Sequence, residues 1–506
     1  MKDEAVPEDI PPVTNRSPTS PIELNGTGER LSGPVAHLPA SLLAELEAIC
    51  ETTSDVHAAA QASRDWWPLA LHWALDGCVP RRAGVVVRPT SVEQVSAVLS
   101  ACLRATVPVT AAGGRSGVCG ASVPVFGGVV ADLTALQGVV EVDEVSGLVG
   151  VRAGTFGPDL EDVLREAYGL TVGHFPQSFE LATVGGWVAC RGAGQYSTRY
   201  GKIEQMVAAL EVVLADGTVV RTGGSPAAAT GPDLTQLFVG SEGMLGIITT
   251  VWLRTHPLPA AQRRAAFRFA TLGDGFEACR QLVRRGATPA VLRLYDAIES
   301  AADRGGDGTD CVLLVLDEGD PAIVDATMAV VADACRNGLP ADAELVGRWL
   351  AHRNDTSALQ ALTKKGYVVD TMEVAAPWSR LDGLVAAVTE AQRAVQHTIV
   401  SSCHLSHSYL DGACVYFTFV ATPPAGDVEA TYVALWDAGQ RAALGAGGNL
   451  SHHHGVGLNR ARFAAEALGG AGHQVLASIK HALDPAGILN PGKFGLDSPL
   501  GAVAWP

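Results

Sequence analysis

Three consecutive histidines, His452, His453 and His454, lie between glycine-rich flanks in the stretch GGNLSHHHGVG, residues 447–457. Histidine titrates near neutral pH, so it can exchange a proton with a substrate or with a neighbouring side chain. In an extended strand, successive side chains point to opposite faces, which would place His452 and His454 on one side and His453 on the other. If this stretch is extended, the three rings cannot share one task.

A glycine-rich run, AAGGRSGVCGASVPVFGG, begins at Ala111 directly after an apolar stretch that reads as a strand. Glycines expose consecutive backbone N–H groups that can cradle a pyrophosphate, although tight turns alone would explain a single run of this kind equally well. The spacing matches neither a P-loop nor G-x-G-x-x-G, because Arg115 stands at the second glycine. Two further glycine-rich loops, within residues 171–207 and 231–249, favour one extended dinucleotide held by all three.

The chain has 506 residues, of which 47% are hydrophobic, enough for two or three globular domains. Its 36 basic and 53 acidic side chains give a net charge of -17, which argues against nucleic acid as a partner. Ten cysteines without a C-x-x-C pair favour a reducing compartment. The sequence has no apolar run of about 20 residues and no signal-peptide pattern, so we expect a cytoplasmic protein without a transmembrane segment.

Strands and helices alternate along most of the chain. The pattern predicts strands over residues 84–88 and 107–110 around a helix over 91–104, and a hairpin whose Asp216-Gly217 turn has positive φ at both residues. Prolines near residue 258 mark a domain boundary. Residues 1–38 are rich in Pro, Ser, Thr and Glu, which predicts a disordered tail.

The three loops, in their order and spacing, resemble the flavin-binding domain of the vanillyl-alcohol-oxidase superfamily. GHFPQSFELATVGGW, YGKIEQMV, TMEVAAPWSRL, DGACVYFTF and SHHHGVG look most like the alkyldihydroxyacetonephosphate synthases, over roughly residues 60 to 495. The resemblance implies an α+β fold, with a two-part FAD-binding domain and an α+β cap that holds the substrate. It divides the chain into an FAD-binding domain over 39–257, a cap over 258–455 and a C-terminal segment over 456–506 that returns to the first domain.

The resemblance also implies which residues bind FAD. Some relatives attach the flavin through a histidine in the glycine loop, but Arg115 and Ser116 stand there, so we expect non-covalent FAD. The implied cofactor-binding residues are Gly113, Gly114, Arg115, Ser116, Gly117, Pro176, Ser178, Thr183, Gly185, Gly186, Glu242, Gly246 and Ile248.

By the same resemblance, Tyr416 is the general acid/base and the histidine triplet supports it near the flavin. His174 corresponds to a histidine near the flavin, while Arg293 and Arg380 correspond to active-site arginines, whose guanidinium groups suit phosphate oxygens. Related dehydrogenases bind a metal in this part of the cap, where His404 and His407 could supply ligands. The acidic residues and the glycine-rich run of those dehydrogenases are absent here, so we expect no metal.

The implied reaction exchanges an acyl group for an alkyl group on dihydroxyacetone phosphate through an adduct at flavin N5, without net redox change. The partners would be acyl-dihydroxyacetone phosphate and a long-chain alcohol, and the enzyme would be a homodimer. Animal synthases read H-E-P-D-S where this chain has HFPQS, residues 174–178, and thereby lacks two carboxylates. The alternatives are an FAD-dependent oxidase or dehydrogenase of an alcohol, amine or hydroxy acid, and a non-catalytic flavoprotein.

Overall fold

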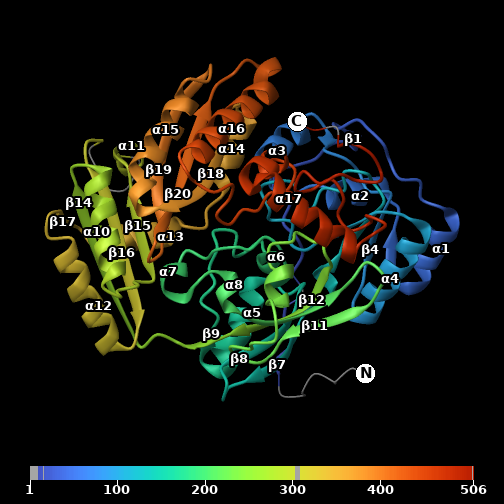
Figure 1. Cartoon of the computed structure of the whole chain (residues 1–506), viewed down its shortest axis with the longest axis horizontal. Coiled ribbons are helices and arrows are strands. Elements are labelled where there is room, and N and C mark those ends of the chain that lie inside the picture. Colours follow the sequence, from blue (N-terminus) through green and yellow to red (C-terminus); the bar gives the residue numbers. More distant parts are fainter. Residues whose placement is uncertain (1–9, 15, 302–307, 504, 506) are drawn as a thin grey trace.

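The computed structural model describes residues 10–14, 16–301, 308–503 and 505 (Figure 1). Its described strands form sheets in two parts of the molecule, each with its own helices, so the predicted α+β fold is confirmed. The first part contains a four-stranded and a five-stranded sheet, and the second contains one seven-stranded sheet. We refer to the second part, which carries this large sheet, as the cap.

The four-stranded sheet has the order β2-β4-β6-β5 and carries the glycine-rich loop at the end of β5. As predicted, a helix capped by Ser91, whose side chain accepts from the Gln94 backbone N–H, separates two strands. β4, β6 and β5 run parallel, which places their carboxyl ends at one edge. The elements are β2 (Glu51–Thr53), β4 (Val85–Arg88), α4 (Val92–Ala105), β5 (Val109–Ala112) and β6 (Val129–Asp132).

The five-stranded sheet is antiparallel and contains the predicted hairpin. Only Gly217 has positive φ, at 87°, so the prediction of positive φ at Asp216 was wrong. The Gly217 backbone N–H donates to the Leu214 carbonyl, which makes Ala215 and Asp216 the central turn residues and leaves the left-handed position to the glycine after them. The strands are β7 (Val139–Asp143), β8 (Leu148–Arg152), β10 (Val207–Val213), β11 (Val219–Gly223) and β12 (Ile247–Arg254).

The cap sheet has the order β17-β14-β16-β15-β19-β20-β18. One face, with Leu292, Leu313 and Phe417, packs against the apolar sides of the helices that cover it. The opposite face turns toward Phe175 and Tyr196 of the first part. The elements are β14 (Ala261–Phe269), α10 (Leu272–Arg284), β15 (Val291–Tyr295), β16 (Cys311–Gly319), α12 (Pro321–Ala334), β17 (Leu339–Ala341), α13 (Glu344–His352), β18 (Val368–Pro377), α15 (Leu381–Arg393), β19 (Thr398–Ser408), β20 (Gly412–Ala421) and α16 (Val428–Gly445).

The N-terminal segment is ordered where it is described, which corrects the predicted disordered tail over residues 1–38. β1 (Gly28–Glu29) pairs with β3 (Cys78–Val79), and Ile22 and Leu31 are buried. The segment gains backbone hydrogen bonds and apolar burial from the folded body, which its own composition does not reveal. The part of the prediction that covers residues 1–9 and 15 lies outside the described residues.

The chain returns to its first part at its C-terminal end. The Asn490 backbone N–H donates to the Val109 carbonyl in β5, and the Lys493 ammonium donates to the Val123 carbonyl. In Figure 1 the red C-terminal segment, including α17 (Ala464–Leu483), lies against the blue and green N-terminal elements. Two distant stretches of sequence therefore build the domain that carries the glycine-rich loop.

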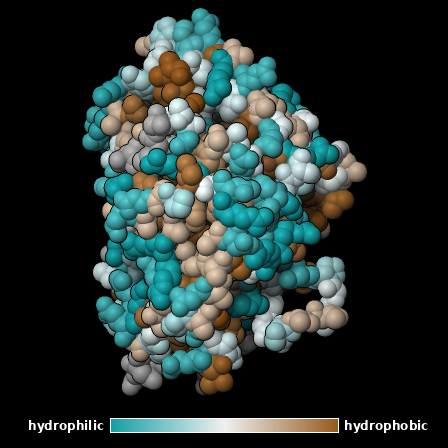
Figure 2. Space-filling model, turned by 90° about the vertical axis from the view of Figure 1, so that its left-hand side faces the viewer, coloured by the Kyte–Doolittle hydropathy of each residue, from teal (hydrophilic) through white to brown (hydrophobic). Residues whose placement is uncertain are grey.

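The outer surface of the cap is mainly hydrophilic, with hydrophobic side chains scattered over it (Figure 2). Ion pairs such as Arg263–Asp325 and Arg285–Asp333 contribute to it. No helix in the described part of the chain is long and apolar enough to span a membrane.

Candidate active site

Four side chains form one row across the inner face of the cap sheet. The register places Tyr295 opposite His404, His404 opposite Tyr416, and Tyr416 opposite Glu373, on β15, β19, β20 and β18. Residues directly opposite one another point to the same face, so the row faces the first part of the molecule. The His404 and Tyr416 rings stack with their centroids 4.9 Å apart.

A β-bulge adds His407 to this face. The register of β19 and β20 shifts between Leu405 and His407, and His407 then pairs with Cys414. Without the extra residue, the side chain at position 407 would point to the opposite face from His404. The bulge therefore lets both histidines serve the same site.

The histidine triplet lies in a bent loop, so the prediction based on an extended strand does not apply. Glu373 organises the loop: its carboxylate accepts hydrogen bonds from the His453 and His454 backbone N–H groups and from the Ser451 hydroxyl. Arg460 donates to both carboxylate oxygens of Glu373, and both side chains are fully buried. Although burial opposes it, Arg460 together with His454 holds the pKa of Glu373 well below its usual value.

The hydroxyls and rings of four residues form a continuous hydrogen-bonded chain. The Tyr416 hydroxyl bonds His453 Nε2, His453 Nδ1 lies 2.7 Å from His452 Nδ1, and His452 Nε2 lies 2.6 Å from the Tyr409 hydroxyl. If the Tyr416 hydroxyl donates to His453, each neutral imidazole accepts a hydrogen bond on one nitrogen and donates one from the other. Each of the three hydrogen bonds then has one donor and one acceptor, and all three run in the same direction, from Tyr416 to Tyr409. This chain, Tyr416–His453–His452–Tyr409, can pass a proton away from Tyr416.

Burial sets the protonation states along the chain. It lowers the pKa of His452 and His453 well below the usual value, and the Lys202 ammonium lowers the pKa of His452 further. Burial also raises the pKa of Tyr416, with further contributions from Cys414 and Glu373. In the resting enzyme the His452 and His453 rings are therefore neutral, and the Tyr416 phenol keeps the proton that it can donate.

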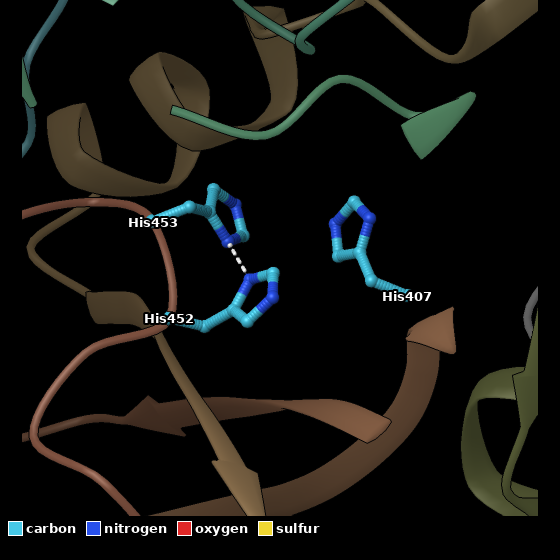
Figure 3. A group of neighbouring side chains, drawn as sticks. All are labelled: His407, His452 and His453. Carbon is cyan, nitrogen blue, oxygen red and sulfur yellow. Dashed lines mark hydrogen bonds between the residues drawn. The ribbon is translucent and has the colours of Figure 1, made fainter. Parts of the chain in front are cut away.

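His407, His452 and His453 place one ring nitrogen each within 4.8 Å of one another, as three metal ligands would. Figure 3 shows His452 and His453 directed toward each other, with His407 facing them from β19. His407 Nδ1 lies 2.6 Å from the Ser197 hydroxyl. Hydrogen bonds thus engage both ring nitrogens of His452 and of His453, which favours a proton-transfer cluster over a metal centre.

Arg293 and His404 lie beside Tyr416. Arg293 Nη2 lies 2.7 Å from His404 Nε2, and the other ring nitrogen of His404 lies 2.8 Å from Glu299 Oε2. Because arginine only donates, His404 Nε2 must accept and Nδ1–H must donate to Glu299. This pairing fixes one neutral tautomer of His404 and the orientation of its ring against Tyr416.

Arg380 lies apart from this group. It is exposed, directly after β18, and its guanidinium packs beside Gly447, in the loop that precedes the triplet. Of the two arginines named from the sequence, Arg293 is the one that contacts the Tyr416 row.

The predicted flavin loops pack on one another at the end of β5. A Cβ on Gly114 would lie 2.0 Å from the Leu181 carbonyl oxygen, and one on Gly113 would lie 2.3 Å from Thr183 Oγ1. Glycine is therefore required where the first loop meets the second. Thr183 caps α6 (Val184–Ala189), and its hydroxyl accepts from the Gly186 N–H.

The third loop ties the flavin region to the histidine loop. Glu242 accepts hydrogen bonds from the backbone N–H groups of Val456 and Gly457, directly after the triplet. Its role among the described contacts is therefore to hold the histidine loop. The remaining predicted cofactor residues lie in these same loops, in α6 or on β12: Arg115, Ser116, Gly117, Pro176, Ser178, Gly185, Gly246 and Ile248.

Several buried polar atoms around these loops lack a hydrogen-bond partner within the described residues. They include both ring nitrogens of His174, Asp65 Oδ2, Arg64 Nη1 and Ser241 Oγ. Burial lowers the pKa of His174 to about 3, so the imidazole is neutral. Buried polar groups are normally bonded, so these free donors and acceptors suit a bound polar group such as a dinucleotide.

Sequence reasoning named Tyr416, the triplet and Arg293, but it missed the side chains that hold them. Glu373, Arg460, Tyr409 and Glu299 were not singled out. Glu373 and Tyr409 lie in or beside sequence stretches that carried the resemblance. A buried acid inside an apolar strand, as in TMEVAAP, was the available signal for Glu373.

Two protein-family models match this chain. Residues 83–223 match the family model described as an FAD binding domain, and residues 258–494 match the C-terminal domain of FAD linked oxidases. The uncharacterized FAD-linked oxidoreductase YgcU of Escherichia coli O157:H7 is 34% identical over 433 residues, which cover 80% of this chain and 88% of that relative. Alkyldihydroxyacetonephosphate synthase of Caenorhabditis elegans is 27% identical, over 82% of this chain and 76% of its own.

Solved structures show the same fold. An alkyldihydroxyacetonephosphate synthase structure superimposes with a TM-score of 0.74 at 24% identity, covering 93% of this chain and 90% of its own. p-Cresol methylhydroxylase superimposes with a TM-score of 0.74 at 18% identity, covering 90% of this chain and 96% of its own. The predicted flavin-binding fold is thus confirmed, and the chain belongs to the family of FAD-linked oxidases as an FAD-dependent enzyme with the vanillyl-alcohol-oxidase type of fold.

Proposed function

We propose that this enzyme exchanges the acyl group of acyl-dihydroxyacetone phosphate for a long-chain alkyl group, as an alkyldihydroxyacetonephosphate synthase does. The observation that carries the proposal is the hydrogen bond between the Tyr416 hydroxyl and His453 Nε2, on the cap face that looks toward the flavin loops. The exchange needs a proton to leave and return at one substrate carbon. A phenol joined to a neutral imidazole provides an acid and a base for this purpose.

In this proposal Tyr416 exchanges the proton with the substrate, and His453 holds or returns it. His452 and Tyr409 extend the path, and Glu373 and Arg460 keep the histidine loop in place. His404 orients the phenol ring through their stacked contact.

The loops around Gly113, Thr183 and Glu242 would hold FAD non-covalently, and His174 would lie beside the flavin. Bound FAD supplies the electrophilic centre of the reaction. The unbonded ring nitrogens of His174 and the unbonded Ser241 hydroxyl are then available to it.

The experiment is an exchange assay with palmitoyl-dihydroxyacetone phosphate and hexadecanol in the absence of an electron acceptor. Ether product and free palmitate are expected from the wild type and are expected to be lost in Tyr416→Phe and His453→Ala. Tyr367→Phe, at a partly exposed tyrosine away from the site, is the matched control. A wild-type protein that contains flavin yet forms no ether product would refute the exchange reaction.

A second candidate is an oxidoreductase of an alcohol or hydroxy acid. It is favoured by the 34% identity to an FAD-linked oxidoreductase and by the 28% identity to the glycolate oxidase subunit GlcD of Bacillus subtilis. Here the Tyr416 oxygen would accept the hydroxyl proton of the substrate as its own proton passes to His453. Anaerobic bleaching of the flavin by a hydroxy acid would support this candidate, and a spectrum that stays unchanged across such acids would argue against it.

A further inference from the structure

Two arginines lie against one tryptophan at the junction of the two parts of the molecule. The guanidinium carbons of Arg293 and Arg353 lie 5.4 Å and 5.9 Å from the ring centroid of Trp349, which belongs to α13. Arg353 also donates to the Tyr196 hydroxyl at 3.1 Å. Among the described residues, the side-chain hydrogen-bond partners of the two guanidinium groups are Tyr295, His404 and Tyr196, none of which is a carboxylate.

Two positive charges thus lie against one ring, and no described carboxylate pairs with either, so a bound anion would be attracted by both. Guanidinium groups present several fixed N–H donors, which match the oxygens of a carboxylate or a phosphate. The aromatic faces of Trp349 and Tyr196 hold the two groups in place through cation–π contact. The arrangement is therefore suited to an anion.

Unbonded polar atoms surround Arg353. Its own Nε, Gln195 Oε1 and Asn354 Oδ1 are buried and have no hydrogen-bond partner within the described part of the chain. The Gln195 side-chain N–H donates to the Arg353 carbonyl at 3.2 Å, so this amide is held at the cluster. The free donor suits an anion oxygen, and the two free acceptors suit the O–H of a singly protonated phosphate or another donor of the ligand.

The cluster reaches the acid/base site through Arg293. The same guanidinium that lies against Trp349 bonds His404, whose ring stacks on Tyr416. On the other side, the Tyr196 ring packs against Phe175, the neighbour of His174. A ligand held at Arg353 would thus lie between the cap row and the predicted flavin site.

We infer that Arg353, with Arg293, Gln195 and Asn354, binds the anionic head group of the substrate. The inference rests on the proposed function in placing the chemistry at Tyr416, and it adds Arg353 as a residue that determines specificity. A carboxylate and a phosphate share the required chemistry.

The test is calorimetric titration of the FAD-loaded enzyme with three probes: glycerol 3-phosphate, glycerate and glycerol. At least one anion is expected to bind, glycerol is expected not to bind, and Arg353→Gln should weaken anion binding tenfold or more. Arg348→Gln removes the same charge from an exposed position on α13 and should leave the dissociation constant unchanged. The better of the two anions identifies the head group as a phosphate or a carboxylate.

Asn354→Asp provides a second variant that keeps the contact between Arg353 and Tyr196 intact. It places a negative charge beside the cluster and should also weaken anion binding. Anion affinities that stay within twofold of wild type in both variants would overturn the inference, as would a wild type that binds neither anion.

The binding test is independent of turnover. Anion binding that depends on Arg353, together with no exchange in the palmitoyl-dihydroxyacetone phosphate assay, would reject the proposed reaction and retain the head-group site. Exchange activity that is unaffected by Arg353→Gln would reject the site and retain the reaction.

Discussion

The Tyr416 hydroxyl bonds His453 Nε2 and lies 3.5 Å from His454 Nε2, so one phenol meets two imidazoles of the same loop. Tyr416→Phe removes this hydroxyl while keeping the ring that stacks on His404. We expect turnover to fall roughly 100- to 10,000-fold, the range of a lost general acid or base. Steady-state turnover is the measurement, with flavin content as the control; activity within threefold of wild type would contradict the role of Tyr416.

Tyr409 forms the far end of the hydrogen-bonded chain, 2.6 Å from His452 Nε2. Tyr409→Phe should lower turnover by about tenfold, less than Tyr416→Phe, because His453 can still accept the first proton. The pH profile of turnover should also change, since the path to Tyr409 is broken. An unaltered rate and pH profile would show that the chain does not carry protons beyond the histidines.

The ion pair of Glu373 with Arg460 is completely buried beneath the histidine loop. Arg460→Met would leave the Glu373 carboxylate buried without its cation and should lower the free energy of unfolding by about 3–5 kcal/mol. Adding Glu373→Gln should restore part of that loss. Denaturant unfolding measures both variants, and equal stability of Arg460→Met and wild type would refute the assigned role.

Asp370 accepts hydrogen bonds from Tyr432 and Trp436 inside the cap, and burial raises its pKa to about 6. The folded state therefore binds the acid proton of Asp370 more tightly than the unfolded state does. The stability that this proton adds is complete below about pH 4 and is lost as the pH rises through 6. Asp370→Asn should remove a pH-dependent difference of about 3 kcal/mol. Unfolding at pH 4 and pH 7 measures it, and parallel pH dependence in both proteins would contradict the prediction.

Removal of metal ions should have little effect. The ring nitrogens of His452 and His453 are engaged with Tyr409, Tyr416 and each other, so we assign them to protons. Dialysis against a chelator should leave the flavin spectrum and turnover unchanged. A stoichiometric metal, removed together with activity and restored with it, would instead identify His407, His452 and His453 as ligands.

Many helices and strands could be predicted from local sequence patterns, because apolar alternation and helix caps depend on residues that are close together in the sequence. The strand–helix–strand unit around α4 is an example. The site was harder to predict, since the row from Tyr295 to Glu373 depends on the order β15-β19-β20-β18. Strand order and register come from long-range pairing, which no local pattern reports.

The bulge before His407 had no visible signal in the sequence either, and strict alternation would have placed this histidine on the wrong face. The bent histidine loop was missed for a related reason. Its shape is imposed by Glu373, about 80 residues earlier, through bonds to the loop backbone. A buried carboxylate acting at that separation becomes evident only once the two segments are placed side by side.

The return of the C-terminal segment to β5 has a consequence for the order of assembly. The Asn490 side chain donates to the carbonyls of both Ala121 and Glu242, which joins the first and third flavin loops. These contacts span 369 and 248 positions of the chain. Until the segment around Asn490 has been synthesised, the glycine-rich loop lacks this clamp, and such distant contacts form slowly. The two predicted flavin loops would therefore be joined only after this segment has left the ribosome and folded back onto them.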